Sequence, residues 1–266
     1  MIQRKNDTTY IATISGGKDS VTMCDLLLKN NYPVDYIVFN DTLDEFKEMY
    51  EYLNKVEEYF LRRYSKKIIR TKPLKTYDEY IFRTLSKGKR VGKVAGLPNL
   101  THTFCEWRRD SKIRPFDKWI KENITDKYKT YIGITLDETH RVDREKNFLY
   151  PLIDNFKMTS EHCIAYLKNQ EMENPLYKHF TRTGCRKCQY QSDRDFFNIW
   201  KHYPHVWQEF IDYEARVKKI DNVVNKEWFD KNRTCVDMEK KFKQADRQGG
   251  LFDFSDEPVK DCFCKI

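Results

Sequence analysis

The stretch Thr8-Thr9-Tyr10-Ile11-Ala12-Thr13-Ile14-Ser15-Gly16-Gly17-Lys18-Asp19-Ser20 decides the fold of this chain. Its first seven residues are largely apolar and rich in strand-forming types, so they predict a buried β-strand. Apolar residues then recur at helical spacing from Val21 to Leu28. Between the two elements, paired glycines let backbone N–H groups approach an anion, and Lys18 and the positive helix end add favourable charge. The stretch therefore predicts a strand–loop–helix unit that binds phosphate.

The spacing of this loop excludes the commonest phosphate-binding type. In the Walker loop, four residues separate a first Gly from a Gly-Lys pair, and that spacing is absent here. Ser15 and Ser20 instead flank the glycine pair and supply hydroxyl donors. The loop is therefore not expected to be a γ-phosphate loop of the Walker type.

Short apolar runs and helical patterns continue to alternate along the chain. Residues 34–39, 67–70 and 129–134 predict further strands, and residues 44–63 predict a charged helix. This alternation predicts βαβ units and a doubly wound α/β domain with a mainly parallel, five-stranded sheet. The site is expected at the carboxyl ends of the strands. We assign this nucleotide-binding domain to residues 1–183.

The remaining residues, 184–266, have a different pattern. From Phe196 to Val217 they are helical and aromatic, which predicts helices that pack through their rings. The tail from Gln244 onward contains paired glycines and predicts a flexible end. Within the first domain, residues 83–99 mix basic side chains with glycine and proline, and we expect a mobile basic loop there.

Composition excludes several classes of protein. The 266 residues contain only 9 Gly and 8 Pro, which excludes collagen-like and fibrous proteins. The sequence contains no run of about 18 apolar residues, so we expect no membrane-spanning helix. Residues 1–7 lack the apolar core of a secretory signal. We therefore expect a cytoplasmic protein. Lys and Arg number 49 against 41 Asp and Glu, and the resulting net charge of +8 favours a nucleic acid or nucleotide as partner.

The chain has eight cysteines, and a disulfide framework is not expected in a reducing compartment. Cys185 and Cys188 are spaced to direct two thiolates at one ion. This spacing leaves open an iron–sulfur cluster, structural zinc and a redox disulfide. Cys24 falls on the apolar face of the first helix and is predicted to be a buried structural thiol.

Several ordered segments resemble one superfamily. Ser15–Ser20 resembles the S-G-G-x-D-S loop of PP-loop ATP pyrophosphatases, which grips the pyrophosphate of ATP. The other segments resemble its phosphoadenosine phosphosulfate (PAPS) reductase-like family: Asp41–Phe46 (D-T-G-x-E-F), Lys112–Phe116 (K-x-x-P-[LF]), Gly133–Arg141 (G-x-R-x-x-E-S-x-R), Pro151–Asp154 (P-L-x-D), Asn174–Tyr177 (N-P-L-Y) and Gly184–Cys188 (G-C-x-x-C). Dnd-type DNA phosphorothioation sulfurtransferases and phage PAPS reductase-like proteins look nearest.

The chain also departs from the reductase pattern. Leu43 replaces the Gly of D-T-G, and Thr135 stands where the family usually has Arg. Lys18 is typical of members that use ATP. These departures favour ATP-dependent adenylation over sulfonucleotide reduction.

The resemblance implies binding of ATP with Mg²⁺. An adenylation transition state spreads negative charge over the α-phosphate and the departing pyrophosphate, so cations and N–H donors catalyse it. Lys18, Lys112 and Arg141 are the candidate catalytic cations, and Asp19 and Asp41 are candidates for Mg²⁺ or for orienting the loop and ribose. The predicted nucleotide-binding residues are Ser15, Gly16, Gly17, Lys18, Asp19, Ser20, Asp41 and Glu138.

Two simpler interpretations remain open for these carboxylates. Asp41 could cap the helix expected near Asp44. Glu138 and Arg141 could form a surface ion pair three residues apart.

The resemblance further implies a [4Fe-4S] cluster bound by Cys105, Cys185 and Cys188, with zinc as the alternative. Cys235 or Cys163 is a candidate fourth ligand. Otherwise one iron stays open and can bind sulfide.

The C-terminal cysteines suggest a second sulfur site. PAPS reductases carry a catalytic Cys on a mobile tail, and by that analogy Cys264 would deliver a thiolate or persulfide. Lys260 and Lys265 favour the thiolate. Exposed thiols without a role are the open alternative for Cys262 and Cys264.

Three functions are compatible with these features. The first is an ATP-dependent sulfurtransferase that adenylates a nucleic acid and inserts sulfur, with a cysteine desulfurase as sulfur donor and residues 83–93 and 62–70 holding the backbone. The second is a PAPS or adenylylsulfate reductase. The third is a non-catalytic nucleotide-binding subunit of a modification complex. The sequence leaves the oligomeric state open.

Overall fold

The computed structural model describes residues 2–98, 105–143, 147–229 and 233–247. Contacts divide the chain into two compact units. The first unit contains the described residues up to Leu74 and those of Arg108–Cys185. The second unit contains the described residues of Lys75–Trp107 and those from Arg186 onward. The boundary expected at residue 184 lies next to this division, but the segment 75–107 groups with the C-terminal residues.

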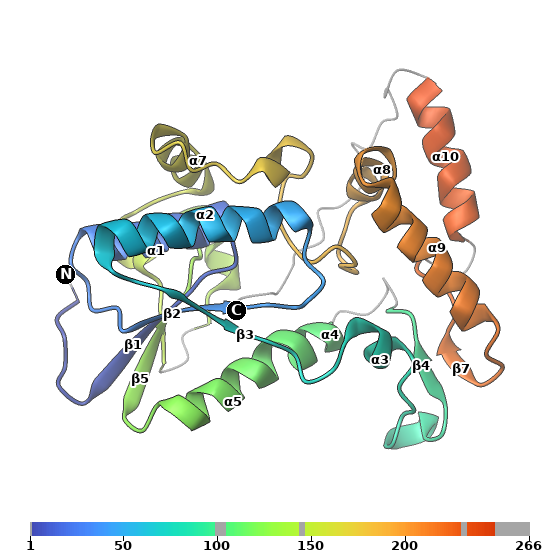
Figure 1. Ribbon diagram of the computed structural model, residues 1–266, viewed down its shortest axis with the longest axis horizontal. Coiled ribbons are helices and arrows are strands. Elements are labelled where there is room, and N and C mark those ends of the chain that lie inside the picture. Colours follow the sequence, from blue (N-terminus) through green and yellow to red (C-terminus); the bar gives the residue numbers. More distant parts are fainter. Residues whose placement is uncertain (1, 99–104, 144–146, 230–232, 248–266) are drawn as a thin grey trace. The chain divides into compact units, whose positions relative to one another are not determined.

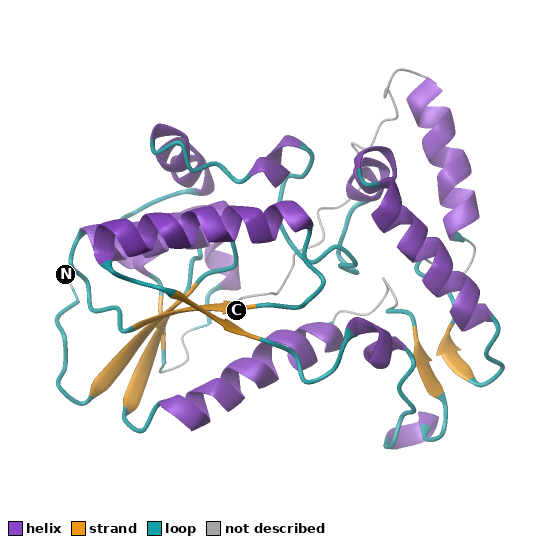
Figure 2. Ribbon diagram, viewed as in Figure 1, coloured by secondary structure: helices purple, strands orange, loops and turns teal. Residues whose placement is uncertain are grey.

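The first unit is built on one parallel sheet of five strands, drawn in orange in Figure 2. In spatial order the strands are β3 (Ile68–Thr71), β2 (Tyr36–Asn40), β1 (Thr8–Thr13), β5 (Lys127–Tyr131) and β6 (Phe148–Leu149). Ile11 of β1 lies between Tyr36 of β2 and Thr130 of β5. The apolar run of β1 is thus the centre of the sheet, as its sequence predicts.

Helices cover both faces of this sheet, which confirms the doubly wound α/β fold. Figure 1 shows α1, α2 and α7 on one face and α5 on the other. Phe116 and Ile120 of α5 form a core cluster with Ile11 and Val38 of the strands. The helices are α1 (Lys18–Lys29), α2 (Lys47–Tyr64), α5 (Arg114–Asn123), α6 (Pro151–Asp154) and α7 (Ser160–Asn169), with a three-residue helix α4 (Glu106–Arg108) that spans the boundary between the units.

The second unit has a helical, aromatic core. Phe196 packs against Phe210 and Phe229 at ring-centroid distances of 5.7 and 5.0 Å, and Trp207 packs against Phe242 at 5.4 Å. Its elements are α3 (Tyr77–Ile81), β4 (Val94–Gly96), α8 (Asp193–His202), α9 (Pro204–Lys218), β7 (Val223–Asn225) and α10 (Cys235–Arg247). The rings therefore pack on one another, as the aromatic helical pattern predicts.

The basic segment expected to be a mobile loop is ordered over its described part, residues 83–98. The backbone N–H of Leu85 donates to Lys93 O at 2.8 Å, which closes a tight hairpin. Strand β4 then pairs in parallel with β7. Gly96 has a φ of +78°, and a Cβ there would lie 2.0 Å from Asn225 O, so only glycine fits beside β7. This pairing explains why residues 75–107 belong to the second unit.

None of the described helices combines the length and apolarity that crossing a bilayer requires.

Candidate phosphate-binding site

Three segments that the sequence singled out follow three neighbouring strands. Ser15–Ser20 follows β1, Asp41–Glu45 follows β2, and Gly133–Arg141 follows β5. Because these strands are adjacent and parallel, their carboxyl ends meet at one edge of the sheet. The chain passes from β1 to β2 on one side, while β5 lies on the other side, so the edge at β1 is a topological switch point. The fold therefore gathers the predicted segments where open α/β sheets bind ligands.

The loop Ser15–Ser20 is closed by its own serines. Ser15 N donates to Ser20 Oγ at 3.0 Å, and the two hydroxyl oxygens are also 3.0 Å apart. Gly17 N donates to Ser15 Oγ at 3.3 Å. Gly16 adopts a φ of +77°, and a Cβ there would lie 2.2 Å from Met49 Sδ. The glycine is thus required both by its backbone conformation and by the approach of α2.

A second segment fixes the loop from outside. Lys18 N donates to the hydroxyl of Tyr177 at 2.9 Å, and Asn174 Nδ2 donates to Gly16 O at 2.8 Å. A Cβ on Gly17 would lie 3.2 Å from Thr183 Oγ1. Local sequence patterns indicate no role for these residues, although the Asn174–Tyr177 segment resembles a family motif. That resemblance is the only signal in the sequence, because a hydrogen bond across 159 residues leaves no local pattern.

The loop concentrates positive charge on Lys18. Its Nζ lies 3.6 Å from Asp19 Oδ2 and 5.4 Å from the centroid of the Tyr177 ring. Burial acts to lower the pKa of this ammonium group, but the nearby Tyr177, Asp19 and Glu138 outweigh burial, so the pKa is raised. Lys18 therefore carries its charge at neutral pH, beside the positive end of α1.

Two carboxylates beside the loop have pKa values shifted in opposite directions. Burial raises the pKa of Asp19, against the opposing effect of Lys18. Burial also acts to raise the pKa of Asp137, but hydrogen bonds, including one from Ser160 N at 2.9 Å, lower it overall. The Cys163 thiol forms a hydrogen bond with Asp19 and is itself fully buried. Opposed shifts of this kind are typical of sites that handle charge or protons.

Glu138 and Arg141 form an ion pair within the short helix η3 (Leu136–Arg141), with 2.5 Å between Arg141 Nη1 and Glu138 Oε1. Their side chains are only 28% and 16% exposed. This is the ion pair of the simpler interpretation, but it is partly buried, and Glu138 also acts electrostatically on Lys18. The pair therefore belongs to the charged surroundings of the loop.

Asp41 does not cap α2, because that helix begins at Lys47. Its Oδ1 accepts hydrogen bonds from Leu43 N and from the Tyr50 hydroxyl, both at 2.8 Å. The side chain thus fixes the turn after β2 and ties it to α2. The Mg²⁺-binding or orienting role of Asp41 stays a prediction.

Lys112 lies in a π-helical turn, η2 (Arg109–Ile113), directly before α5. Burial raises the pKa of Glu45, and the positive charge of Lys112 opposes that shift. The Glu45 carboxylate accepts a hydrogen bond from the Thr42 hydroxyl at 3.0 Å. The structure therefore groups Lys112 with the carboxylates that follow β2.

The predicted metal ligands differ in their surroundings. Cys105, Cys185 and Cys188 are partly exposed, and Cys188 Sγ accepts a hydrogen bond from Tyr190 N at 3.4 Å. Cys235 is buried and hydrogen-bonded to the carboxylate of Glu214. Burial is the main cause of the raised pKa of the Cys235 thiol.

Within the described ranges, no three His, Cys, Asp or Glu side chains are grouped closely enough to hold a metal ion. Cys185 belongs to the first unit, whereas Cys105 and Cys188 belong to the second. Cys24 is buried, as predicted. Cys262 and Cys264 lie outside the described residues.

Comparison with known proteins agrees with the position of this site. The model of the phosphoadenosine phosphosulfate reductase domain matches residues 9–191. Two relatives come from Methanocaldococcus jannaschii. Uncharacterized protein MJ0066 is 28% identical over 214 residues, which are 75% of this chain and 40% of the relative. Uncharacterized protein MJ0973 is 26% identical over 225 residues, which are 80% of this chain and 49% of the relative.

The chain thus spans half or less of the length of these two relatives. The family match, by contrast, covers well over half of this chain and includes all three segments at the carboxyl edge of the sheet. The chain therefore belongs to the phosphoadenosine phosphosulfate reductase domain family of the PP-loop ATP pyrophosphatase superfamily.

Proposed function

We propose that this protein is an ATP-dependent sulfurtransferase that adenylates an oxygen of a nucleic acid and replaces that oxygen with sulfur. The observation that carries the proposal is the loop Ser15–Ser20, which presents Lys18 and the start of α1 at the switch point of the sheet. This arrangement suits an anionic leaving group better than it suits a neutral ligand.

In the first step, the acceptor oxygen attacks the α-phosphate of ATP and pyrophosphate leaves. The ammonium group of Lys18 and the positive end of α1 hold the departing pyrophosphate. Arg141 and Lys112 lower the cost of the charge that develops on the α-phosphate. Asp19 and Asp41 would hold Mg²⁺, which supplies further neutralisation of the phosphate charge when it is bound.

In the second step, a sulfide equivalent attacks the adenylated carbon or phosphorus, and AMP departs with the original acceptor oxygen. The sulfur donor is proposed to be a cysteine desulfurase, and Cys264 is the proposed carrier on this chain, as a persulfide. Attack by the outer sulfur leaves a disulfide between Cys264 and the acceptor. An external dithiol reductant cleaves this disulfide, releasing the thiolated acceptor and the Cys264 thiol, and is itself oxidised to a disulfide. The net charge of +8 supports a nucleic acid as the acceptor, because phosphate backbones attract basic proteins.

A cluster is proposed separately, and no step above depends on it. Cys105, Cys185 and Cys188 are the proposed ligands of a [4Fe-4S] cluster, with zinc as the alternative. The N–H of Tyr190 directed at Cys188 Sγ supports a thiolate at that position. Anaerobically purified protein should contain iron, which Cys185→Ser and Cys188→Ser should lose and Cys24→Ser should keep. Zinc without iron, or iron unchanged in all three variants, would contradict the cluster.

A sulfonucleotide reductase is the second candidate, and the family match favours it. The two candidates differ in the nucleotide consumed. A reductase converts PAPS or adenylylsulfate to sulfite and needs a thiol reductant. A sulfurtransferase converts ATP to AMP and pyrophosphate.

The test supplies the full chain, under anaerobic conditions, with sulfide, Mg²⁺, a mixture of DNA and transfer RNA, and either ATP or PAPS. We expect AMP and pyrophosphate from ATP, with thiolated nucleotides in the digested nucleic acid by mass spectrometry. Sulfite from PAPS, together with unaltered ATP and nucleic acid, would establish the reductase instead.

A further inference from the structure

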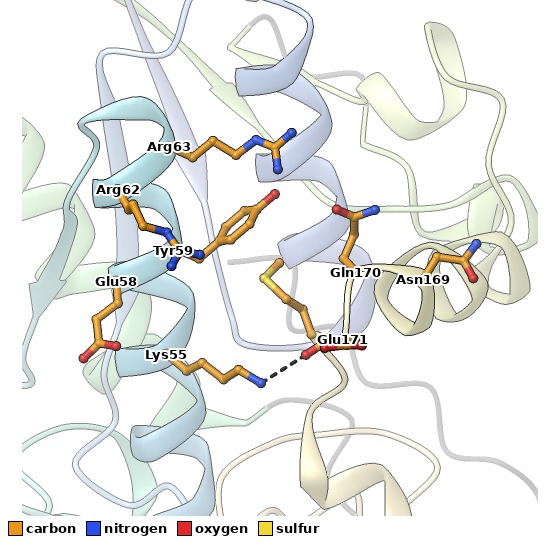
Figure 3. A pocket seen from close by; sticks show the side chains of 9 residues that line it. Lys55, Glu58, Tyr59, Arg62, Arg63, Asn169, Gln170 and Glu171 are labelled. Carbon is orange, nitrogen blue, oxygen red and sulfur yellow. Dashed lines mark hydrogen bonds between the residues drawn. The ribbon is translucent and has the colours of Figure 1, made fainter.

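The strongest feature outside the loop is a pair of cavities at the far end of α2. One cavity, of about 670 Å³, lies between α2 and the residues that end α7, and Figure 3 shows it from close by. The other, of about 630 Å³, lies beside the last turn of α2. Arg63 lines both cavities. We call the two cavities together the Arg63 groove.

The groove is basic. Its lining includes five cationic side chains against the carboxylates of Glu58 and Glu171. Figure 3 shows Glu58 directed away from the cavity, while Tyr59 and Arg63 extend from α2 toward Gln170. The cationic side chains are Arg4, Lys55, Arg62, Arg63 and Lys66.

Two of these cations, Lys55 and Lys66, are held in place without being neutralised. Lys55 Nζ donates to Glu171 O at 3.0 Å, and Lys66 Nζ donates to Val34 O at 2.6 Å. Both acceptors are backbone carbonyls. Among the described residues, Arg4 alone of the five has a carboxylate partner, Asp35 at 2.8 Å. The groove therefore presents fixed positive charge that a ligand can neutralise.

The groove also contains flat groups, namely the Arg63 guanidinium and the rings near it. Its guanidinium lies 5.7 Å from the ring centroid of Tyr59 and 5.9 Å from that of Tyr64. The Tyr64 hydroxyl donates to buried Asp25 at 2.8 Å, which fixes the ring. Aromatic rings and guanidinium groups stack on nucleobases of any sequence, whereas the rings offer nothing to a chain of acidic side chains.

The cations are spread over a distance that a single phosphate does not span. Lys55 and Arg63 are eight positions apart on α2, which corresponds to about 12 Å along the helix axis. Arg63 is 14 positions beyond Met49, the residue that touches the loop, or about 21 Å. The groove thus fits an extended polyanion, and it is distinct from the phosphate loop.

We propose that the Arg63 groove binds the sugar–phosphate backbone and bases of a single nucleic acid strand, away from the reacting loop. This proposal extends the proposed acceptor to a second contact, but it concerns binding and requires no turnover. Binding here would hold a long acceptor while another part of it reaches the loop.

The test measures fluorescence anisotropy of a short fluorescein-labelled single-stranded DNA without ATP. Arg62→Ala/Arg63→Ala should weaken binding about tenfold or more. It should also lower the slope of log affinity against log salt by about 0.7 for each phosphate that the variant no longer neutralises. The matched control is Lys118→Ala/Lys121→Ala, which removes equal charge from α5 on the other face of the sheet. The control should bind nearly as the wild type does.

Equally weakened binding in both double variants would mean a general attraction to basic protein, and unchanged binding in both would mean a different site. Both results overturn the groove. Polyglutamate that binds as tightly as the DNA and is equally sensitive to the arginine variant would assign the groove to acidic peptides instead. The single variant Arg62→Ala provides the same comparison if the double variant fails to fold, as judged by circular dichroism. Because no ATP is present, these outcomes are independent of whether the protein releases pyrophosphate.

Discussion

The phenolic oxygen of Tyr177 accepts a hydrogen bond from the backbone N–H of Lys18 at 2.9 Å, although 159 residues separate them. This N–H belongs to the first turn of α1, where backbone donors have no acceptor within the helix. The same ring lies 5.4 Å from Lys18 Nζ. Tyr177 thus fixes both the backbone and the side chain of the residue proposed to hold pyrophosphate.

Tyr177→Phe should loosen the loop. Losing the buried hydroxyl should cost about 1 kcal/mol of unfolding free energy. Because the loop must then be ordered on binding, the affinity for ATP should fall about fivefold or more. Tyr64→Phe is the matched control, since it removes a hydroxyl that bonds to Asp25, away from the loop. Calorimetric titration with ATP should show weakened binding only for Tyr177→Phe. Affinity equal to or tighter than that of the wild type would show that Tyr177 does not support the loop.

Gly133→Ala should disturb the packing of β5 against the loop. A Cβ at Gly133 would lie 2.8 Å from Ser20 Cα and 3.0 Å from Ser20 N, and backbone atoms at those distances must shift. The expected destabilisation is about 1–3 kcal/mol.

Gly184→Ala provides the control for this substitution. A Cβ at Gly184 meets no atom within 4 Å, so that variant should stay within about 0.5 kcal/mol of the wild type. Chemical denaturation of both variants measures the difference. Equal stability of the two would show that the close approach at Gly133 is relieved without cost.

Lys187 lies between Cys185 and Cys188 in the sequence. Its Nζ forms an ion pair with Glu209 Oε2 at 2.6 Å, and its side chain is only 2% exposed. Its ammonium group also lies 5.2 and 5.6 Å from the ring centroids of Tyr77 and Tyr213. Glu209→Gln would leave this charge poorly compensated, which should cost roughly 2 kcal/mol. Glu51→Gln breaks the exposed pair with Lys47, and should cost less than about 0.5 kcal/mol. Similar destabilisation in both variants would contradict a special role for Lys187.

The same ion pair predicts a dependence on pH. Burial acts to raise the pKa of Glu209, but Lys187 and Arg186 outweigh it, so the pKa is lowered from its ordinary 4.5. The pair therefore contributes its full stability above pH 4.5, and this contribution is lost as the pH falls through the lowered value. The difference in unfolding free energy between wild type and Glu209→Gln should shrink over that range. A difference that is constant or grows on acidification would contradict the pairing.

Local patterns are sufficient to predict the sheet and the loop. The apolar run before Ser15 and the helical spacing after Asp19 are both contained within about a dozen residues, and each forms the predicted element. Similar patterns predict β2, β3 and β5 to within a few residues. Burial on both faces makes β1 and β2 largely apolar runs, which are visible in a single sequence, whereas β5 mixes polar and aromatic residues.

Long-range pairing is not predictable in this way. Strands β4 and β7 have three residues each and are separated by more than 120 positions, so neither shows a periodic signal. Their pairing nevertheless moves residues 75–107 out of the first unit and orders a segment expected to be mobile. The contacts of Tyr177 and Asn174 with the loop escape prediction for the same reason.

Pyrophosphate release from ATP by the full chain, with nucleic acid and Mg²⁺ present, is the decisive measurement for the loop. Lys18→Ala and Asp19→Ala should each reduce the rate about 100-fold or more, because Lys18 supplies positive charge at the phosphates and Asp19 is a proposed Mg²⁺ ligand. Lys118→Ala, on the other face of the sheet, should release pyrophosphate at the wild-type rate. Circular dichroism spectra should match across the variants. Wild-type turnover in Lys18→Ala or Asp19→Ala would show that Ser15–Ser20 is not where the nucleotide reacts.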